Sequence, residues 1–323
     1  MPYQAICKIL PPGLREVVHS LPQGVSATIE EIRVRQGRPL EVITPTHAWF
    51  VDKAGTLSKS PDCAWIPTRG DCVKLLNLIS NHSLYALEEE LKRGFVTIEG
   101  GHRIGLAGRV VVEQGGVKHL RDITSFNIRI ARQVKGVGER WISTVLHEGR
   151  IENLLIVSPP QCGKTTLVRD LARLAGTGGQ GYPAYKVGIV DERSEIAGCL
   201  HGVPQHDVGL RTDVLDGCPK AEGMMMMIRS MSPDILVVDE LGRAEDTEAI
   251  HEAVYAGVSV FATVHGRSIE ELMHRPTFAP LLGEGVFSRI MILSRAQGPG
   301  TVERVLDASG RPLHPNRREV VAG

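Results

Sequence analysis

Residues 154–171 read LLIVSPPQCGKTTLVRDL, and the rest of the chain is best interpreted outward from this segment. An apolar run typical of a buried strand enters a loop, and a helical pattern begins at Gly163-Lys164-Thr165. Phosphates bind at such junctions, because backbone N–H groups and the helix dipole both favour an anion there. We expect Gly163 to permit close backbone approach, Lys164 to reach the β- and γ-phosphates of ATP, and Thr165 to ligate Mg²⁺.

This loop departs from the usual pattern G-x-x-x-x-G-K-[ST] at its first position, where Ser158 replaces glycine. Pro159 and Pro160 should stiffen the loop. A glycine-capped turn with an exposed lysine is the alternative interpretation, but a strand before the motif and a helix after it favour a phosphate loop. The predicted nucleotide-binding residues here are Ser158, Pro159, Pro160, Gln161, Cys162, Gly163, Lys164, Thr165 and Thr166.

A second apolar run, ILVVDE at residues 235–240, ends in two carboxylates. Ligands of parallel sheets bind beyond the carboxyl ends of the strands. We therefore expect Asp239 to hold Mg²⁺ through water, and Glu240 to orient or deprotonate the attacking water. A solvated strand end is the alternative, and it loses weight because a phosphate loop precedes this strand.

Two further segments supply candidate residues. KVGIVDERSEIAG at residues 186–198 is predicted to be an additional strand between the two motifs, which indicates the ATPase division with a catalytic glutamate; Asp191 and Glu192 follow it. SVFATVHG at residues 259–266 ends a fourth strand near His265, which could sense the γ-phosphate. A charged turn for the first segment and a structural histidine for the second stay open as alternatives.

The domain organisation follows from the order of these elements. Short buried strands alternate with helices after residue 150, which predicts an α/β core of the RecA-like, catalytic-glutamate type with a parallel sheet covered on both faces. The preceding part mixes strand and helix signals and reads as a smaller α+β domain. We predict an N-terminal α+β domain, a linker with a connecting helix, an ATPase domain and a tail, at residues 1–133, 134–150, 151–310 and 311–323 respectively.

Within the N-terminal part, several segments have clear periodicity. The predicted strands are 30–43 (a pair joined by a turn), 95–116 and 125–134, and the predicted helices are 72–81 and 83–94, the second ending at Gly94. The connecting helix is predicted over ERWISTVLHEGR, residues 139–150.

Composition narrows the function classes. The chain has 323 residues, 37 Lys plus Arg against 37 Asp plus Glu, and 4% aromatic residues, so neither backbone tracking nor base stacking on nucleic acid is favoured. Its six cysteines form no C-x-x-C pair, which favours free thiols in a reducing compartment. We expect no signal peptide and no membrane span, hence a cytoplasmic protein with at most peripheral membrane association.

The motifs PPQCGKTT, VDERSE, RSMSPDILVVDE and AVYAGVSVFATVHG, in this order, resemble the secretion-superfamily ATPases of type II and type IV systems. The segment DVGLRTDVLDGCPKAEGMMMMIRSMSPDILVVDELG at residues 207–242 looks like the stage III sporulation protein AA family of spore-forming bacteria. The resemblance spans residues 25–306, and the family has glycine where this chain has Ser158.

The resemblance implies an ATP- and Mg²⁺-dependent motor of a channel between mother cell and forespore. It implies a homo-hexamer, membrane proteins of the sporulation channel as partners, and a position at the inner face of the membrane on the mother-cell side. Carried over residue by residue, it gives Glu240, Glu192 and His265 as catalytic residues, and Thr165 and Asp239 at the metal. An N-terminal domain supplies arginines to the phosphates in secretion ATPases, and the candidates here are Arg103, Arg109, Arg129 and Arg132; exposed strand charges are the alternative.

Two rival functions remain open. One is a nucleic-acid-dependent motor on the same RecA-type core, which neutral charge and few aromatic residues disfavour. The other is a nucleotide-gated assembly factor with little turnover; the pair Asp239-Glu240 argues against it, whereas Ser158 leaves it open.

Overall fold

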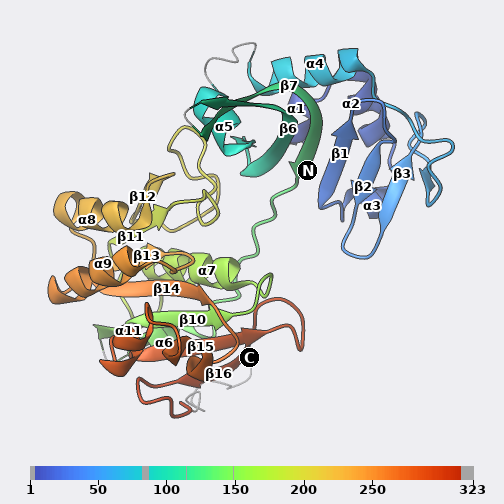
Figure 1. The fold of residues 1–323 in the computed structure, drawn as a ribbon. Helices are drawn as coiled ribbons and strands as arrows, with labels where there is room; N and C mark the ends of the chain where they lie inside the picture. Colours follow the sequence, from blue (N-terminus) through green and yellow to red (C-terminus); the bar gives the residue numbers. More distant parts are fainter. Residues whose placement is uncertain (1–3, 82–86, 114, 148, 314–323) are drawn as a thin grey trace. The chain divides into compact units, whose positions relative to one another are not determined.

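The computed structural model describes residues 4–81, 87–113, 115–147 and 149–313. The chain divides into two compact units, Met1–Arg132 and Gln133–Gly323, which Figure 1 shows in colours that follow the sequence. Within the part of the chain that is described, no helix is both long and apolar enough to cross a membrane.

The first unit is built on a seven-stranded sheet in the order β4-β3-β2-β1-β7-β6-β5. Every neighbouring pair in it is antiparallel. The strands are β1 (Glu31–Arg35), β2 (Glu41–Ile43), β3 (Ala48–Val51), β4 (Leu57–Ser58), β5 (Phe95–Ile98), β6 (His102–Glu113) and β7 (Gly116–Arg129). The helices are α1 (Gln4–Ile9), α2 (Pro12–His19), α3 (Gln23–Ser26), α4 (Arg69–Ile79) and α5 (Glu88–Arg93).

Local sequence explains these elements. In β1, Ile32 and Val34 are buried while their neighbours are partly exposed, as a strand with one face on the core requires. The strand pair predicted over 30–43 is confirmed as β1 and β2. Thr68 begins α4 with a capping box, in which its side chain accepts from the backbone of Asp71 and Asp71 accepts from that of Thr68.

The second predicted helix of this unit, over 83–94, falls partly on residues 82–86, outside the described residues. Its later part is confirmed as α5, and Gly94 ends it in the left-handed region with φ 80°. The strand predicted over 125–134 is the end of β7, which stops at Arg129.

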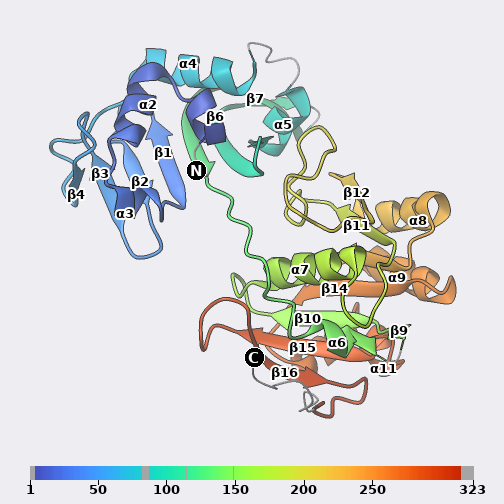
Figure 2. The ribbon, with the colours of Figure 1, turned by 180° about the vertical axis from the view of Figure 1, so that it is seen from behind.

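The second unit carries the predicted α/β core. Its sheet has the order β12-β11-β13-β14-β10-β15-β16, and only the pair β15 with β16 is antiparallel; Figure 2 shows it from behind. The strands are β10 (Leu154–Ser158), β11 (Val187–Asp191), β12 (Thr212–Asp216), β13 (Ile235–Val238), β14 (Ser259–His265), β15 (Arg289–Ser294) and β16 (Thr301–Leu306). The helices are α6 (Ile142–Val145), α7 (Lys164–Thr177), α8 (Lys220–Met231), α9 (Ala244–Tyr255), α10 (Ile269–Met273) and α11 (Ala279–Gly283).

Alternate residues of the central strands enter two different cores. Leu154 and Ile156 of β10 pack with α6 and α7 on one face. Leu155 and Val157 pack with α8, α9, α10 and α11 on the other. Burial on both faces accounts for the nearly continuous apolar runs in the sequence, and it confirms the predicted α/β class.

The connecting helix predicted over 139–150 is wrong in length. Among the described residues of this range only α6, a single turn, is helical, and β8 (Leu146–His147) then pairs with β9 (Arg150–Ile151). Gly149, with φ 73°, suits the tight turn between β8 and β9, where the predicted helix would have continued. Of the predicted tail at 311–323, residues 314–323 lie outside the described residues, and Leu313 packs on the core that contains α7.

Candidate functional site

The phosphate loop joins β10 to α7 at the carboxyl edge of the sheet. Gly163 precedes the helix with φ 86°, a conformation that side chains disfavour. A Cβ at this position would lie 2.8 Å from the backbone nitrogen of Gly300, whose N–H donates to the carbonyl of Cys162 at 2.8 Å. No side chain caps the first turn of α7, so its backbone N–H groups face the loop and could receive phosphate.

Ser158, the unusual residue of the motif, ends β10 and is fully buried. Its hydroxyl donates to the carbonyl oxygen of Pro159 at 2.8 Å. It pairs in register with His265 of β14. The serine therefore has space and a hydrogen-bond partner, and its buried hydroxyl is satisfied within the loop itself.

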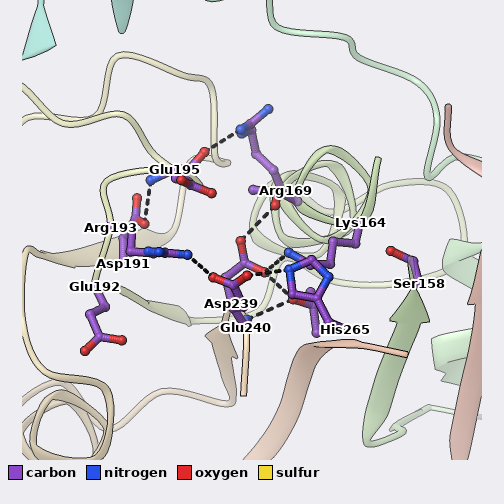
Figure 3. Close-up of polar contacts among 12 residues, drawn as sticks. Ser158, Lys164, Arg169, Asp191, Glu192, Arg193, Glu195, Asp239, Glu240 and His265 are labelled. Atoms are coloured by element: carbon purple, nitrogen blue, oxygen red, sulfur yellow. Dashed lines mark hydrogen bonds and ion pairs between the residues drawn. The ribbon is translucent and has the colours of Figure 1, made fainter. Parts of the chain in front are cut away.

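Lys164 and Asp239 come together at the next position along the sheet edge (Figure 3), and Thr165 contacts the same carboxylate. Lys164 Nζ lies 3.5 Å from Asp239 Oδ1, and the Thr165 hydroxyl donates to Asp239 Oδ2 at 2.8 Å. The Thr263 hydroxyl donates to the Oδ1 atom of the same carboxylate. A hydroxyl and a carboxylate on adjoining elements are hard oxygen donors of the kind Mg²⁺ takes, with waters and phosphate oxygens completing its octahedron. The residues present thus fit the metal that the motif predicts.

Glu240, the next residue along the chain, has an unusual backbone with φ 57°. Its N–H donates to the Thr263 hydroxyl at 2.9 Å, which fixes this conformation. A left-handed residue other than glycine costs on the order of 1–3 kcal/mol, and such strain is concentrated at functional sites. The Glu240 carboxylate accepts from Arg193 on one oxygen and contacts His265 Nε2 on the other. The structure therefore brings His265 and Glu240 together.

The acidic segment after β11 forms a tight loop around Asp191. This carboxylate is buried, and it accepts from the backbone N–H groups of Glu195 and Ala197, both at 2.8 Å. Burial raises the pKa of Asp191, and these backbone hydrogen bonds oppose the rise. The arrangement assigns Asp191 to holding the loop.

Arg169 of α7 completes the loop from the other side, and sequence reasoning did not find it. Its guanidinium donates to the carbonyls of Glu195, at 2.6 Å, and Ile196. Burial lowers the pKa of Arg169, with the Asp191 charge acting in the opposite direction. The spacing from Thr165 was the available signal, because residues four apart share one face of a helix.

Glu192, the second predicted acid, is paired elsewhere. Its Oε2 lies 2.7 Å from Lys220 Nζ, a buried ammonium at the start of α8. Figure 3 shows its side chain directed away from Asp239 and Glu240. The catalytic role of Glu192 stays a prediction.

The four predicted arginines all belong to the first unit. Arg103 lies over the Phe95 ring, 3.9 Å from its centroid. Arg129 Nε lies 3.8 Å from Glu31 Oε1, and Arg132 donates to the Ile29 carbonyl at 3.0 Å. Arg109 is exposed on β6, where it pairs in register with Arg121. Their contact with nucleotide stays a prediction.

Comparison with known proteins places this chain in a family. A family model described as "Sporulation stage III, protein AA" matches residues 2–313. The Bacillus subtilis (strain 168) protein "Stage III sporulation protein AA" is 52% identical over 308 residues, 95% of this chain and 96% of that protein.

Solved structures show the same fold at low identity. The Yersinia pseudotuberculosis ATPase DotB has a TM-score of 0.54 at 14% identity, covering 87% of this chain and 76% of that one. The pilus retraction motor PilT with bound ADP has a TM-score of 0.53 at 14% identity, covering 81% and 73% respectively. The fold is that of the secretion ATPases, and the family match with the 52% identical relative establishes that this chain belongs to the stage III sporulation protein AA family.

Proposed function

We propose that this protein binds ATP with Mg²⁺, hydrolyses it to ADP and phosphate, and drives a secretion-like channel that is assembled between mother cell and forespore. The observation that carries the proposal is the convergence of Lys164 and Thr165 with Asp239, beside Glu240, at one edge of the sheet. The fold supports it as well, since it is shared with a protein described as an ATPase and with a motor that holds ADP.

The residues divide the chemistry among them. Backbone N–H groups at the start of α7 would bind the phosphate oxygens, and Lys164 would neutralise charge on the β- and γ-phosphates. Thr165 would hold Mg²⁺ directly and Asp239 would hold it through water, and the ion when bound neutralises and orients the phosphates. Glu240 would accept a proton from the water that attacks the γ-phosphate. His265 lies against this base and would help to orient it.

The wider assembly follows the family. We propose a homo-hexameric ring in the cytoplasm, at the inner face of the membrane, with membrane proteins of the sporulation channel as partners. Nucleic acid is not among the proposed partners.

The experiment that tests the proposal is steady-state ATP hydrolysis by the full chain, with nucleotide affinity measured by calorimetry. Lys164→Ala should abolish tight ATP binding, because the phosphates lose their main cationic partner. Glu240→Gln should retain binding and lower turnover about a hundredfold or more, the worth of a positioned general base. Lys53→Ala, which removes an exposed positive charge outside the nucleotide motifs, is the control and should change neither.

The outcomes separate the alternatives. Unchanged ATP affinity in Lys164→Ala would overturn the phosphate-loop assignment. Wild-type turnover in Glu240→Gln would move the base elsewhere, with Glu192 next. Binding without turnover would favour the assembly factor, and stimulation by single-stranded nucleic acid would favour the nucleic-acid motor.

A further inference from the structure

We infer that Arg193 is a positioning residue that restrains the base Glu240 and releases it by moving to the γ-phosphate of ATP. This inference rests on the proposed function, because it concerns the same site. It adds a step in which recognition of the γ-phosphate and activation of the base depend on one side chain.

The first observation is the position of Glu240 between two neighbouring strands. It follows β13, which lies between β11 and β14 in the sheet. Arg193 follows β11 and contacts Glu240 Oε2, whereas His265 ends β14 and contacts Glu240 Oε1. Figure 3 shows both side chains directed at this carboxylate. One carboxylate oxygen is therefore engaged by a residue of the loop after β11 and the other by the last residue of β14.

The second observation is that the Arg193 side chain is much more exposed than the Glu240 side chain that it contacts. The backbone of Glu240 is fixed by Thr263, whose hydroxyl and carbonyl accept from the N–H groups of Glu240 and Leu241 at 2.9 and 2.8 Å. The Arg193 side chain is 63% exposed, compared with 25% for Glu240. The loop that bears Arg193 is itself held through Asp191. The guanidinium can thus change its orientation while the loop backbone keeps Arg193 beside the site.

The larger negative charge of the γ-phosphate favours movement of Arg193 from Glu240 to bound ATP. Glu240 raises the pKa of Arg193, so the guanidinium stays charged throughout. A γ-phosphate carries more charge than a carboxylate, and arginine binds it in a bidentate manner. ADP has no γ-phosphate, and it would leave Arg193 on Glu240.

Release of Glu240 gives the water a proton acceptor. In hydrolysis the water oxygen forms a bond to the γ-phosphorus, and the bond from that phosphorus to the bridging oxygen breaks. The electron pair leaves with ADP, and the proton of the water passes to the freed Glu240 oxygen. A carboxylate whose oxygens are both engaged by Arg193 and His265 is poorly placed to accept that proton.

The test is a double-mutant cycle on affinity. Calorimetry measures the affinity for a non-hydrolysable ATP analogue relative to ADP in wild type, Arg193→Ala, Glu240→Gln and the double variant, with folding checked by circular dichroism. If Arg193 is shared between Glu240 and the γ-phosphate, Glu240→Gln should raise this ratio about tenfold in the wild-type background, the order of one charge-assisted contact. In the Arg193→Ala background, Glu240→Gln should raise the ratio by a clearly smaller factor. Arg193→Lys should restore part of the difference, and the exposed Lys53→Ala should leave it intact.

The inference would be overturned if the effect of Glu240→Gln were not smaller in the Arg193→Ala background than in the wild-type background. If Arg193 only screens Glu240 where it stands, its removal leaves Glu240 to repel the γ-phosphate more strongly, so Glu240→Gln would have an equal or larger effect in the Arg193→Ala background. An equal or larger effect of Glu240→Gln in the Arg193→Ala background would remove the role of Arg193. The proposed function would still stand if wild type binds nucleotide and Lys164→Ala does not. Failure of wild type to bind either nucleotide would overturn both.

Discussion

At the scale of single residues, Glu240 combines a strained backbone with a side chain that two neighbours contact. Its φ of 57° lies in the left-handed region, which glycine adopts freely and other residues disfavour. The hydrogen bonds to Thr263 keep it there. A residue selected for stability alone at this positive φ would be glycine and not glutamate.

Comparing glycine with alanine at this position tests the strain. Glu240→Ala and Glu240→Gly both remove the carboxylate, so their difference in stability reports the backbone. We expect the glycine variant to be the more stable by about 1 kcal/mol, reversing the usual order in which glycine is the weaker residue. Urea unfolding measures it, and both variants should lack turnover. Alanine equal to or more stable than glycine would show that the backbone at Glu240 is unstrained.

At the scale of elements, the start of α7 depends on one glycine. Gly163 needs a positive φ, and a Cβ there would meet the backbone of Gly300. We expect Gly163→Ala to destabilise the protein by about 2 kcal/mol or more and to abolish nucleotide binding, because both the conformation and the contact are lost.

The matched control is Gly242→Ala. Gly242 follows the acidic strand at the same edge of the sheet, but its φ is not positive and a Cβ there meets nothing within 4 Å. Thermal unfolding of both variants checks the prediction. Similar melting temperatures for the two would mean that the loop rearranges around the added methyl group.

The elements also show what could be predicted from sequence. The strands β10, β11, β13 and β14 were found because both of their faces are buried, which leaves continuous apolar runs. The strand β12 was missed, since TDVLD at the edge of the sheet is only partly buried and carries charges. At the site, contiguous motifs led to Lys164 and Asp239, which the folded chain brings within 3.5 Å of each other, and their roles stay predictions. Lys220 was not predicted, because its partner Glu192 is distant in sequence and only the folded chain brings the two together.

At the scale of the whole molecule, the proposed ring predicts that neighbouring subunits complete each other's sites. We expect the ATPase rate per subunit to rise with protein concentration, and at least one of Arg103, Arg109, Arg129 and Arg132 to be needed for turnover but not for folding. An arginine that stabilises charge on the γ-phosphate is worth about 10³-fold or more in rate. Specific activity across a concentration series, with single Arg→Ala variants, measures both effects.

Arg109 offers the cleanest of these variants, because its side chain is exposed and its removal should leave stability unchanged within about 0.5 kcal/mol. A rate that does not change with concentration, together with full activity of all four variants, would mean that each site is self-sufficient.

The segment that enters the second unit is attached to that unit by side chains. Lys135 Nζ lies 2.6 Å from Asp207 Oδ2, and this hydrogen bond is the main reason that the pKa of Asp207 is lowered. Gln133 exchanges two hydrogen bonds with the backbone of Asp207. Gly138 donates its N–H to Asp170 of α7 at 2.8 Å.

The lowered pKa gives this attachment a dependence on pH. A carboxylate whose folded pKa lies below its ordinary value contributes stability above that ordinary value, and the contribution is lost as pH falls through the lowered pKa. Both side chains are about half exposed, so we expect Lys135→Ala to cost less than about 1 kcal/mol at pH 7 and less still at the lowest pH at which the protein stays folded. Urea unfolding at the two pH values measures this, with the exposed Lys53→Ala as control. A cost that does not change with pH would contradict it.

Hydrogen exchange of residues 133–138 can monitor this attachment. The amide protons of Gly138 and Asp207 are both hydrogen-bonded to side chains, at 2.8 and 3.0 Å, and an amide exchanges with deuterium only when such a bond opens. Asp207 lies in the segment that leads from the acidic loop to β12. Binding of nucleotide beside the acidic loop should therefore change the deuterium uptake of residues 133–138, far along the chain from Lys164, on the timescale of local opening. Mass-resolved exchange could then report nucleotide binding at a position outside the phosphate loop.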